Sequence, residues 1–372
     1  MSFFTFILRN MLGRPTRTLL TVLGVGVGIA AVVMLTGISW GFERSMSAIY
    51  QSRGIDLIVV RAGVSDQLSS TLDETQIDTI RAIPGVEQAA PSLMDAVSFE
   101  EANLVSVLAN GWEPGGLLIK GLKVIHGRAL EQGDTRAVML GRVLSLNLGK
   151  KVGETVSIAG EPFRIIGIYE SDSLFESGGL VVPLRELQRM MGREGSVTGF
   201  VVVAKPKVDP RALGREIETK LKGTAAIPAR DYVQENIQLR LARAMAGATI
   251  AVALALGSIG LLNTMAMAVF ERTGEIGLLR ALGWRRTRII ALLMGEAATL
   301  GLLGVVAGSL LAVVGMRGMM LSPTSRGFID PNLPPAAFAI AALMGALLCV
   351  LGGLYPAIRA SRLEPTEALR HE

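Results

Sequence analysis

The sequence predicts a membrane protein with four transmembrane α-helices, one N-terminal and three C-terminal, and an α+β extracytoplasmic domain between helices 1 and 2. Half of the 372 residues are apolar and 19% are charged, a balance too apolar for an ordinary soluble chain. Four apolar runs are each long enough to cross a hydrocarbon core of roughly 30 Å as a helix. A long stretch of mixed polarity separates the first run from the other three.

The apolar runs place the membrane spans at residues 19–42, 244–270, 289–316 and 336–355. Basic residues precede the first run, as they do in a secretory signal peptide. This run is longer than the apolar part of a signal peptide, and no small-residue cleavage site follows it. We therefore interpret it as a retained helix.

Positive charge beside the spans predicts their orientation in a plasma (inner) membrane. The segment 1–18 has three arginines and no acid, the loop 271–288 has five arginines and two acids, and the tail 356–372 adds three arginines. Because short basic loops face the cytoplasm, we expect both termini and this loop inside, and residues 43–243 and the loop 317–332 outside. Residues 43–243 have 24 basic and 25 acidic side chains, so the overall basicity reflects topology and gives no support to nucleic-acid binding.

Strand and helix patterns alternate in the extracytoplasmic domain. Residues 56–61 (DLIVVR) predict a strand, residues 73–86 a helix ended by Pro-Gly, and residues 141–148 a further helix, so an α+β fold is expected. Helical character continues beyond the hydrocarbon at residues 41–53 and 231–245. We interpret these two segments as stalks that join the domain to the membrane helices.

Motifs of nucleotide and catalytic sites occur in the wrong context. Residues 26–31 (GVGIAA) match a dinucleotide-binding turn and residues 37–41 (GISWG) match a nucleophile elbow, but both belong to a predicted membrane helix and do not follow a strand. The sequence has no G-x-x-x-x-G-K-[ST] motif and no Cys/His cluster. We expect no catalytic residue, no metal and no cofactor bound by this chain.

The membrane spans contain two features that need an explanation. Glu296 is their single acid, about two turns from the predicted cytoplasmic end, where snorkelling or helix pairing is favoured over a proton or substrate site. The pairs Gly24/Gly28 and Gly304/Gly308 have the spacing of close helix contacts. Such contacts can form within one chain or between two chains.

Residues 271–288 predict a short amphipathic helix with acids in its first turn and arginines at and beyond its last turn, as the helix dipole favours. One interpretation is a helix on the inner leaflet with arginines near lipid phosphates. The other is a docking helix for a cytoplasmic partner, and periodicity does not separate the two. The side chains that define this segment are Glu271, Arg272, Glu275, Ile276, Leu279, Arg280, Leu282 and Gly283.

"FERTGEIGLLRALGWRRTRII" (residues 270–290) resembles the cytoplasmic loop of the FtsX-like, MacB-type permeases of ABC transporters. "LGRVLSLNLGKKVGETVSIAGEPFRIIGIYE" (residues 140–170) resembles the periplasmic core domain of that family, and "YPAIRASRLEPTEALRHE" (residues 355–372) resembles its C-terminal end. In the family the residues of the 271–288 segment form the coupling helix that sits on the ATPase. The resemblance covers nearly the whole chain.

The resemblance implies a non-catalytic permease that couples ATP hydrolysis to export or extraction of a lipid, lipoprotein, peptide or drug by mechanotransmission. Its expected partners are two ABC ATPase subunits that bind ATP and Mg²⁺, a second permease that is identical or homologous, and the bilayer. A periplasmic adaptor and an outer-membrane channel are further candidates. MacB has an N-terminal ATPase domain for which this chain lacks room, so a separate ATPase is expected. The alternative is an FtsX-like signalling subunit that activates an extracytoplasmic cell-wall hydrolase.

Overall fold

The computed structural model of the protein describes residues 15–64, 67–235, 237–319, 321 and 332–363. These residues form two compact units. Residues 15–39, 242–318 and 332–363 form the membrane unit, and residues 40–241 form the outer domain. The predicted N-terminal segment up to residue 14, most of the loop 317–332 and the tail beyond residue 363 lie outside the described residues.

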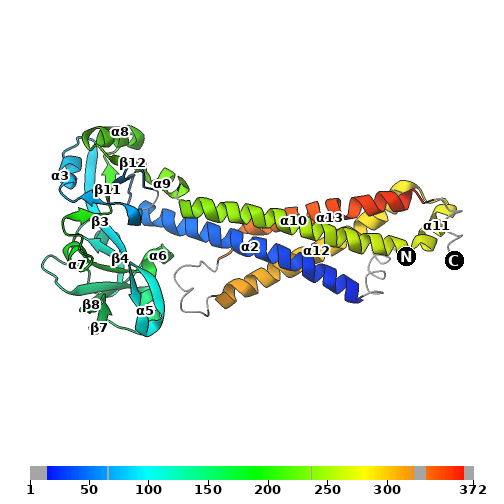
Figure 1. The fold of residues 1–372 in the computed structure, drawn as a ribbon, viewed down its shortest axis with the longest axis horizontal. Helices are drawn as coiled ribbons and strands as arrows, with labels where there is room; N and C mark the ends of the chain where they lie inside the picture. Colours follow the sequence, from blue (N-terminus) through cyan, green and yellow to red (C-terminus); the bar gives the residue numbers. More distant parts are fainter. Residues whose placement is uncertain (1–14, 65–66, 236, 320, 322–331, 364–372) are drawn as a thin grey trace. The chain divides into compact units, whose positions relative to one another are not determined.

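Four of the described helices are long and apolar enough to cross a membrane. They are α2 (Pro15–Gln51), α10 (Ile237–Glu271), α12 (Arg286–Met319) and α13 (Pro335–Ser361), and the short α11 (Thr273–Ala281) joins α10 to α12 (Figure 1). Each helix is longer than the apolar run that predicts it. Polar residues extend the helices at their ends, where the backbone hydrogen bonds continue although the apolar composition stops. The predicted fold class, one N-terminal and three C-terminal membrane helices around an α+β domain, is confirmed.

The outer domain contains a ten-stranded sheet and a two-stranded sheet. In chain order the strands are β1 (Leu57–Arg61), β2 (Leu72–Asp73), β3 (Val86–Phe99), β4 (Leu104–Trp112), β5 (Lys123–Gly127), β6 (Ala137–Gly141), β7 (Thr155–Ile158), β8 (Glu161–Glu170), β9 (Leu180–Pro183), β10 (Ser196–Val197), β11 (Gly199–Ala204) and β12 (Thr224–Pro228). The shorter helices are α3 (Gln76–Arg81), α4 (Leu117–Lys120), α5 (Arg142–Leu148), α6 (Leu174–Ser177), α7 (Leu184–Met190), α8 (Pro210–Lys220) and α9 (Ala229–Glu235), with 3-10 turns η1 (Gln67–Ser69) and η2 (Glu100–Ala102).

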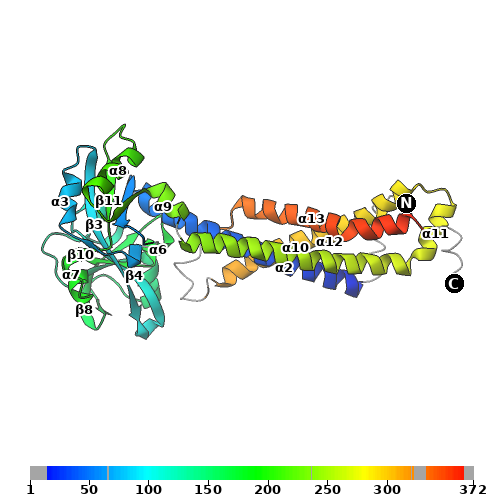
Figure 2. The same cartoon turned by 45° about the horizontal axis from the view of Figure 1, so that its top comes forward.

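The long strand β3 joins the two halves of the large sheet. The strand order is β12-β1-β11-β3-β4-β9-β6-β8-β5, with β7 paired to β8. The first part of β3 pairs with β11 and its second part pairs with β4, and Ser92 takes part in both ladders. The β4–β9 and β6–β8 pairs are parallel and the remaining pairs of this sheet are antiparallel. Figures 1 and 2 show the two groups of strands on either side of β3.

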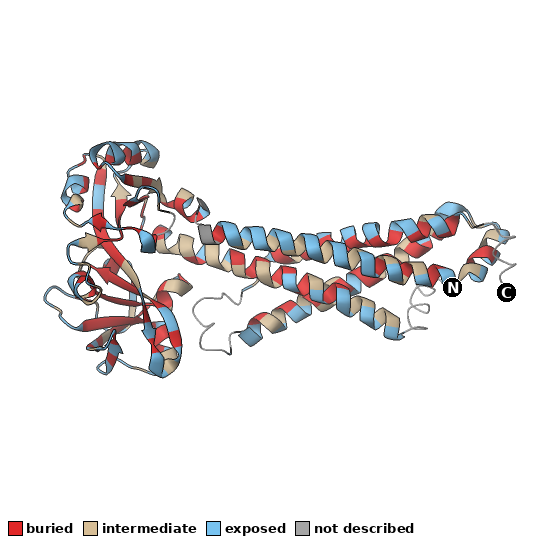
Figure 3. Cartoon of the chain, viewed as in Figure 1, coloured by how far each residue is buried: buried red, intermediate tan, exposed pale blue. Residues whose placement is uncertain are grey.

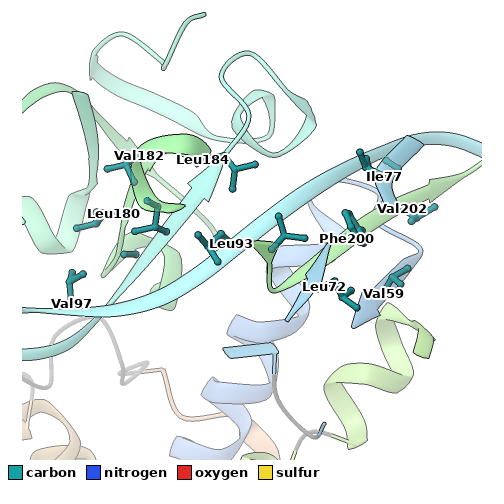
Figure 4. Packing of buried hydrophobic residues seen from close by; sticks show 14 of the residues in the cluster. Val59, Leu72, Ile77, Leu93, Val97, Leu180, Val182, Leu184, Phe200 and Val202 are labelled. Carbon is teal, nitrogen blue, oxygen red and sulfur yellow. The ribbon is translucent and has the colours of Figure 1, made fainter. Parts of the chain in front are cut away.

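Both faces of the sheet are buried, which explains why several strands are continuous apolar runs. In β1, Leu57 and Val59 belong to one core cluster, while Ile58 and Val60 belong to the cluster on the opposite face. The first cluster follows β3 and extends through both halves of the sheet (Figure 4). The second is covered by the C-terminal part of α2, α4 and α9. Strands β6 and β9 are buried along their whole length, whereas β5 at the end of the sheet has no buried residue. Figure 3 shows buried residues on several strands of the outer domain.

Candidate functional site

The candidate site is centred on α11, which is shorter than the predicted helix over 271–288. The chain turns at Arg272, whose φ of −120° and ψ of 18° separate α10 from α11. The helix ends in a Schellman motif, in which the Gly283 N–H donates to the Arg280 carbonyl at 3.0 Å and the Trp284 N–H donates to the Leu279 carbonyl at 3.1 Å. Gly283 has a φ of +89°, a conformation that glycine adopts without strain.

One side of α11 packs against the membrane unit. Ile276 is 2% exposed and belongs to the same core cluster as Ala357 and Ala360 of α13. Leu279 and Trp284 are partly buried against this cluster. Figures 1 and 2 both show α11 at the end of the helix bundle where α10 and α13 end. The helix α11 therefore packs against α13 of the same chain.

One leucine of α11 and one leucine of the turn after it are exposed. Leu278 is 52% exposed and Leu282 is 70% exposed, four residues apart. Glu275 lies one turn before Leu278, and its side chain is 64% exposed. The sequence predicted that Leu282 and Gly283 continue the stripe of Ile276 and Leu279. That prediction was wrong, because the helix ends at Ala281 and both residues belong to the exposed turn that follows.

Arg272 connects the corner between α10 and α11 to α12. Its Nε donates to Glu275 Oε2 at 2.9 Å, and its Nη1 donates to Glu296 Oε1 at 2.8 Å. The Glu296 side chain is 7% exposed and that of Arg272 is 14% exposed. Glu296 therefore takes part in helix pairing, one of the two roles favoured from the sequence. The two residues are 24 positions apart, so the sequence pattern did not reveal this pair.

Two polar contacts join α2 to α10 near the same end of the bundle. Arg17 Nη1 donates to Glu271 Oε2 at 2.9 Å, and the hydroxyls of Thr21 and Thr264 are 2.9 Å apart. The first contact is charge-assisted, and the second joins two neutral hydroxyls. Together with the Arg272–Glu296 pair they connect α2, α10, α11 and α12.

The remaining arginines of the loop lie outside α11. Arg286 and Arg288 belong to the first turn of α12, where the helix dipole disfavours a positive charge. Arg280, Arg285 and Arg286 were expected to complement the dipole of the predicted 271–288 helix, and of these only Arg280 lies in the last turn of α11. The Arg288 guanidinium lies 4.9 Å from the centre of the Trp284 ring, within the range of a cation–π contact.

The glycine pairs have unequal roles. A Cβ added to Gly308 would lie 2.6 Å from the Gly26 carbonyl oxygen, and one added to Gly304 would lie 2.5 Å from Val25 Cγ1, so α12 approaches α2 closely here. Gly28 approaches Ala253 of α10. No described atom lies within 4 Å of a Cβ built on Gly24. Within this chain the neighbouring Gly26 forms the close contact with α12. The packing role of Gly24 stays a prediction, since the sequence left contacts within one chain and between two chains open.

The outer domain contains a buried ion pair that the sequence did not indicate. Arg53 follows α2, and its guanidinium binds both carboxylate oxygens of Glu176 at 2.8 and 3.1 Å. The exposed fractions of the two side chains are 1% and 3%. The two residues are 123 positions apart, and neither has a motif around it. A clue was available only in the long predicted stalk, which ends at Arg53.

Tyr169 of β8 forms a hydrogen bond with the backbone of Glu176. Its hydroxyl donates to the Glu176 carbonyl at 2.7 Å. Burial and the neighbouring Glu176 carboxylate raise the pKa of Tyr169 well above its usual value, so the hydroxyl keeps its proton and remains a donor.

Two family models match the chain. They are the MacB-like periplasmic core domain over residues 18–220 and the FtsX-like permease C-terminal over residues 247–365. The macrolide export ATP-binding/permease protein MacB of a Shewanella species is 28% identical over 396 residues, which is 99% of this chain and 60% of that relative. An uncharacterized ABC transporter permease of Methanocaldococcus jannaschii is 25% identical over 400 residues, which is 99% of this chain and 97% of that relative.

Among solved structures, the periplasmic region of MacB from Actinobacillus actinomycetemcomitans is similar to half of the chain. It has 18% sequence identity and a TM-score of 0.40, and the match covers 50% of this chain and 95% of that one. The chain spans 58–60% of the length of several MacB relatives and nearly all of the archaeal permease.

Proposed function

Because the chain belongs to the MacB/FtsX type of ABC transporter permeases, we propose that it couples ATP hydrolysis by a separate ATPase subunit to export or extraction of a hydrophobic cargo. The cargo class is a lipid, lipoprotein, peptide or drug, and the mode is mechanotransmission. A separate ATPase is supported by the archaeal relative, which this chain matches over nearly its whole length and which is called a permease.

The observation that carries the proposal is the exposed apolar side of α11. Leu278 of α11 and Leu282 of the turn that follows it are both exposed, while Ile276 of the same helix packs against α13. An apolar pair rimmed by a charged side chain, here Glu275, has the character of a small protein-binding surface. The lipid interpretation applies better to Arg285, Arg286 and Arg288, which are exposed after the helix ends.

Movement of the ATPase would enter the membrane unit through α11. Ile276 fixes the helix to α13, and Arg272 ties its first turn to Glu296 of α12. The helix α10 ends directly before this corner. A push on Leu278 and Leu282 therefore acts on three helices at once.

The proposed complex contains two ATPase subunits with bound ATP and Mg²⁺ and two permeases, of which the second is identical or homologous. Both termini and α11 face the cytoplasm, and the outer domain faces the opposite side, as the distribution of arginines favours. In this proposal the ATPase subunits bind the nucleotide and the metal. An adaptor and an outer-membrane channel are further proposed partners.

The docking surface is tested by the substitution Leu282→Glu, with Leu146→Glu of the outer domain as its matched control. Leu146 is 67% exposed and Leu282 is 70% exposed, so the two substitutions have similar costs in the free chain. We expect Leu282→Glu to abolish co-purification of the ATPase while membrane insertion is unchanged, and Leu146→Glu to retain the ATPase. Unchanged association in both variants would reject this surface.

Charge reversal at Glu275 is a second test of the same surface. Reversal at Arg280, which the sequence also suggested, tests the fold of the turn instead, because its guanidinium is partly buried and donates to the Trp284 carbonyl at 3.1 Å. Mass spectrometry of the purified complex then distinguishes transport from signalling. Bound lipid, lipopeptide or drug supports the transporter, whereas a co-purifying cell-wall hydrolase supports the FtsX-like alternative.

A further inference from the structure

The C-terminal part of α2 is attached to the outer domain through one arginine. Arg53 Nη1 donates to Glu176 Oε1 at 2.8 Å and to the Ile49 carbonyl at 2.9 Å, while Nη2 donates to Glu176 Oε2 at 3.1 Å. Its Nε donates to the Leu118 carbonyl of α4 at 3.1 Å. The guanidinium also lies 5.2 Å from the centre of the Trp112 ring of β4. One side chain thus joins the end of α2 to α4, α6 and the sheet.

Two serines that precede Glu176 in the chain also hold this residue in place. Ser171 Oγ donates to Glu176 Oε2 at 2.6 Å, and the Ser173 hydroxyl caps the first turn of α6. The same Ser173 hydroxyl lies 2.9 Å from the hydroxyl of Ser45 of α2. We call Ser45, Arg53, Ser171, Ser173 and Glu176 the Arg53 cluster.

Apolar packing around the Arg53 cluster is incomplete. Phe42 of α2 meets Phe175 of α6 edge to face, with ring centres 4.9 Å apart. Beside these rings a cleft of about 200 Å³ lies between α2 and the sheet, lined by Met46, Ile49 and Asn110 among others. Since part of this interface is open, the directional bonds of the cluster define how the end of α2 is fixed to the outer domain.

An ion pair this deeply buried is a poor source of stability, because desolvation offsets much of its attraction. Its bidentate geometry instead fixes the relative orientation of the two groups. The helix α2 extends from Pro15 to Gln51, so the predicted membrane span and the segment that precedes Arg53 belong to the same helix. The cluster therefore bonds the end of this helix to the rest of the outer domain.

We propose that the Arg53 cluster is the mechanical attachment that transmits ATP-driven movement of α2 to the outer domain, with Arg53 and Glu176 as its positioning residues. The inference rests on the proposed function, since it presumes that the ATPase moves the membrane helices. The proposed function says that the movement enters the permease at α11. This inference adds that the movement reaches the outer domain at the Arg53 cluster.

The test uses the full permease with its ATPase in lipid nanodiscs and the double variant Arg53→Ala/Glu176→Gln. Removing both charges avoids a buried unpaired carboxylate, which would by itself destabilise the outer domain strongly. The matched control is Arg189→Ala/Glu161→Gln, which removes another Arg–Glu pair of the outer domain, joined at 2.9 and 2.6 Å, that does not involve α2.

Hydrogen–deuterium exchange is measured with and without ATP trapped by vanadate, in parallel with the ATPase rate. In the unchanged protein we expect ATP to alter exchange in α10–α12 and in the segment 171–177. In the double variant we expect the response of α10–α12 and the ATPase rate to remain and the response of the outer domain to be lost. The control variant should respond like the unchanged protein.

Covalent rescue separates transmission from a loss of fold. The additional substitutions Ser45→Cys and Ser173→Cys place two thiols where the hydroxyls are 2.9 Å apart, which suits a disulfide. Oxidation should restore the outer-domain response of the double variant, and reduction should remove it again.

Two results would overturn the proposed attachment, and a third would overturn the proposed function as well. An outer-domain response in the double variant equal to that of the unchanged protein rejects the attachment. Failure of the disulfide to restore a lost response rejects it as well. If the unchanged protein itself shows no response to ATP in either unit, the proposed function fails, and the attachment fails with it.

Discussion

The contact between α2 and α12 predicts opposite effects for the same substitution at two glycines. In Gly308→Ala the new Cβ would meet the Gly26 carbonyl oxygen at 2.6 Å and Ile29 Cβ at 2.8 Å. The backbone oxygen cannot move without displacing α2. In Gly24→Ala the new methyl group meets no described atom within 4 Å. Both glycines lie in the interior of long helices, so the substitutions differ only in the space available.

The magnitude follows from two opposing terms. Replacing glycine by alanine inside a helix gains about 1 kcal/mol of helix propensity at both positions. Overpacking costs roughly 1–3 kcal/mol, and only Gly308→Ala incurs it. The membrane unit of Gly308→Ala should therefore be less stable than that of Gly24→Ala by about 1–3 kcal/mol, which is about a 5- to 150-fold difference in an opening equilibrium.

The single cysteine of the chain provides the assay. Cys349 of α13 is buried in the membrane unit, in the core cluster that includes Leu261, Leu293 and Ile276. A thiol-reactive dye reaches it only when the helices separate, so its labelling rate in detergent reports the open population. We expect Gly308→Ala to label faster than Gly24→Ala by the factor given above. Equal rates, or faster labelling of Gly24→Ala, would refute the close contact between α2 and α12.

Three further predictions concern the two units separately. Arg53→Met should lower the free energy of unfolding by about 3–5 kcal/mol, because it leaves a buried carboxylate unpaired. Arg53→Met/Glu176→Leu should recover most of that loss. Equal losses of unfolding free energy for the two variants in chemical denaturation would contradict this prediction. Gly283→Ala should strain the turn, where φ is +89°, by roughly 1–2 kcal/mol. The variant should therefore co-purify with less ATPase, and an amount of ATPase equal to that of the wild type would disprove this prediction. The Arg128 guanidinium lowers the pKa of Asp134 below 3.8, so the stability that Asp134→Asn removes at neutral pH should vanish as the pH falls through that lowered pKa. A wild-type advantage that persists undiminished at the most acidic end of the titration would argue against this pair.

Composition and charge predicted the fold class well because both depend on local sequence. The apolar run at 289–316 lies inside α12 (Arg286–Met319), since a helix must satisfy its own backbone hydrogen bonds in a membrane. The strand predicted at 56–61 is β1, because alternating residues of an apolar run can fill two core clusters.

The candidate site was predicted only where periodicity determines the structure. The position of α11 followed from its acids and leucines, but its end at Ala281 depends on the left-handed conformation of Gly283, which sequence spacing does not reveal. Arg272–Glu296 and Arg53–Glu176 are contacts between distant parts of the chain. Gly24 and Gly26 both have apolar neighbours in the sequence, so the sequence does not distinguish them. The rotation of α2 about its axis decides which of the two contacts α12.

The shared strand β3 makes the outer domain indivisible. Its residues Val86–Ser92 belong to the ladder with β11 and Ser92–Phe99 to the ladder with β4. A deletion of one residue near Ser92 would turn every following side chain of the strand to the opposite face. A gene fragment that ends within β3 would leave each half of the sheet with a missing edge partner. Insertions and domain fusions are therefore compatible with the exposed turns of this domain and incompatible with its central strand.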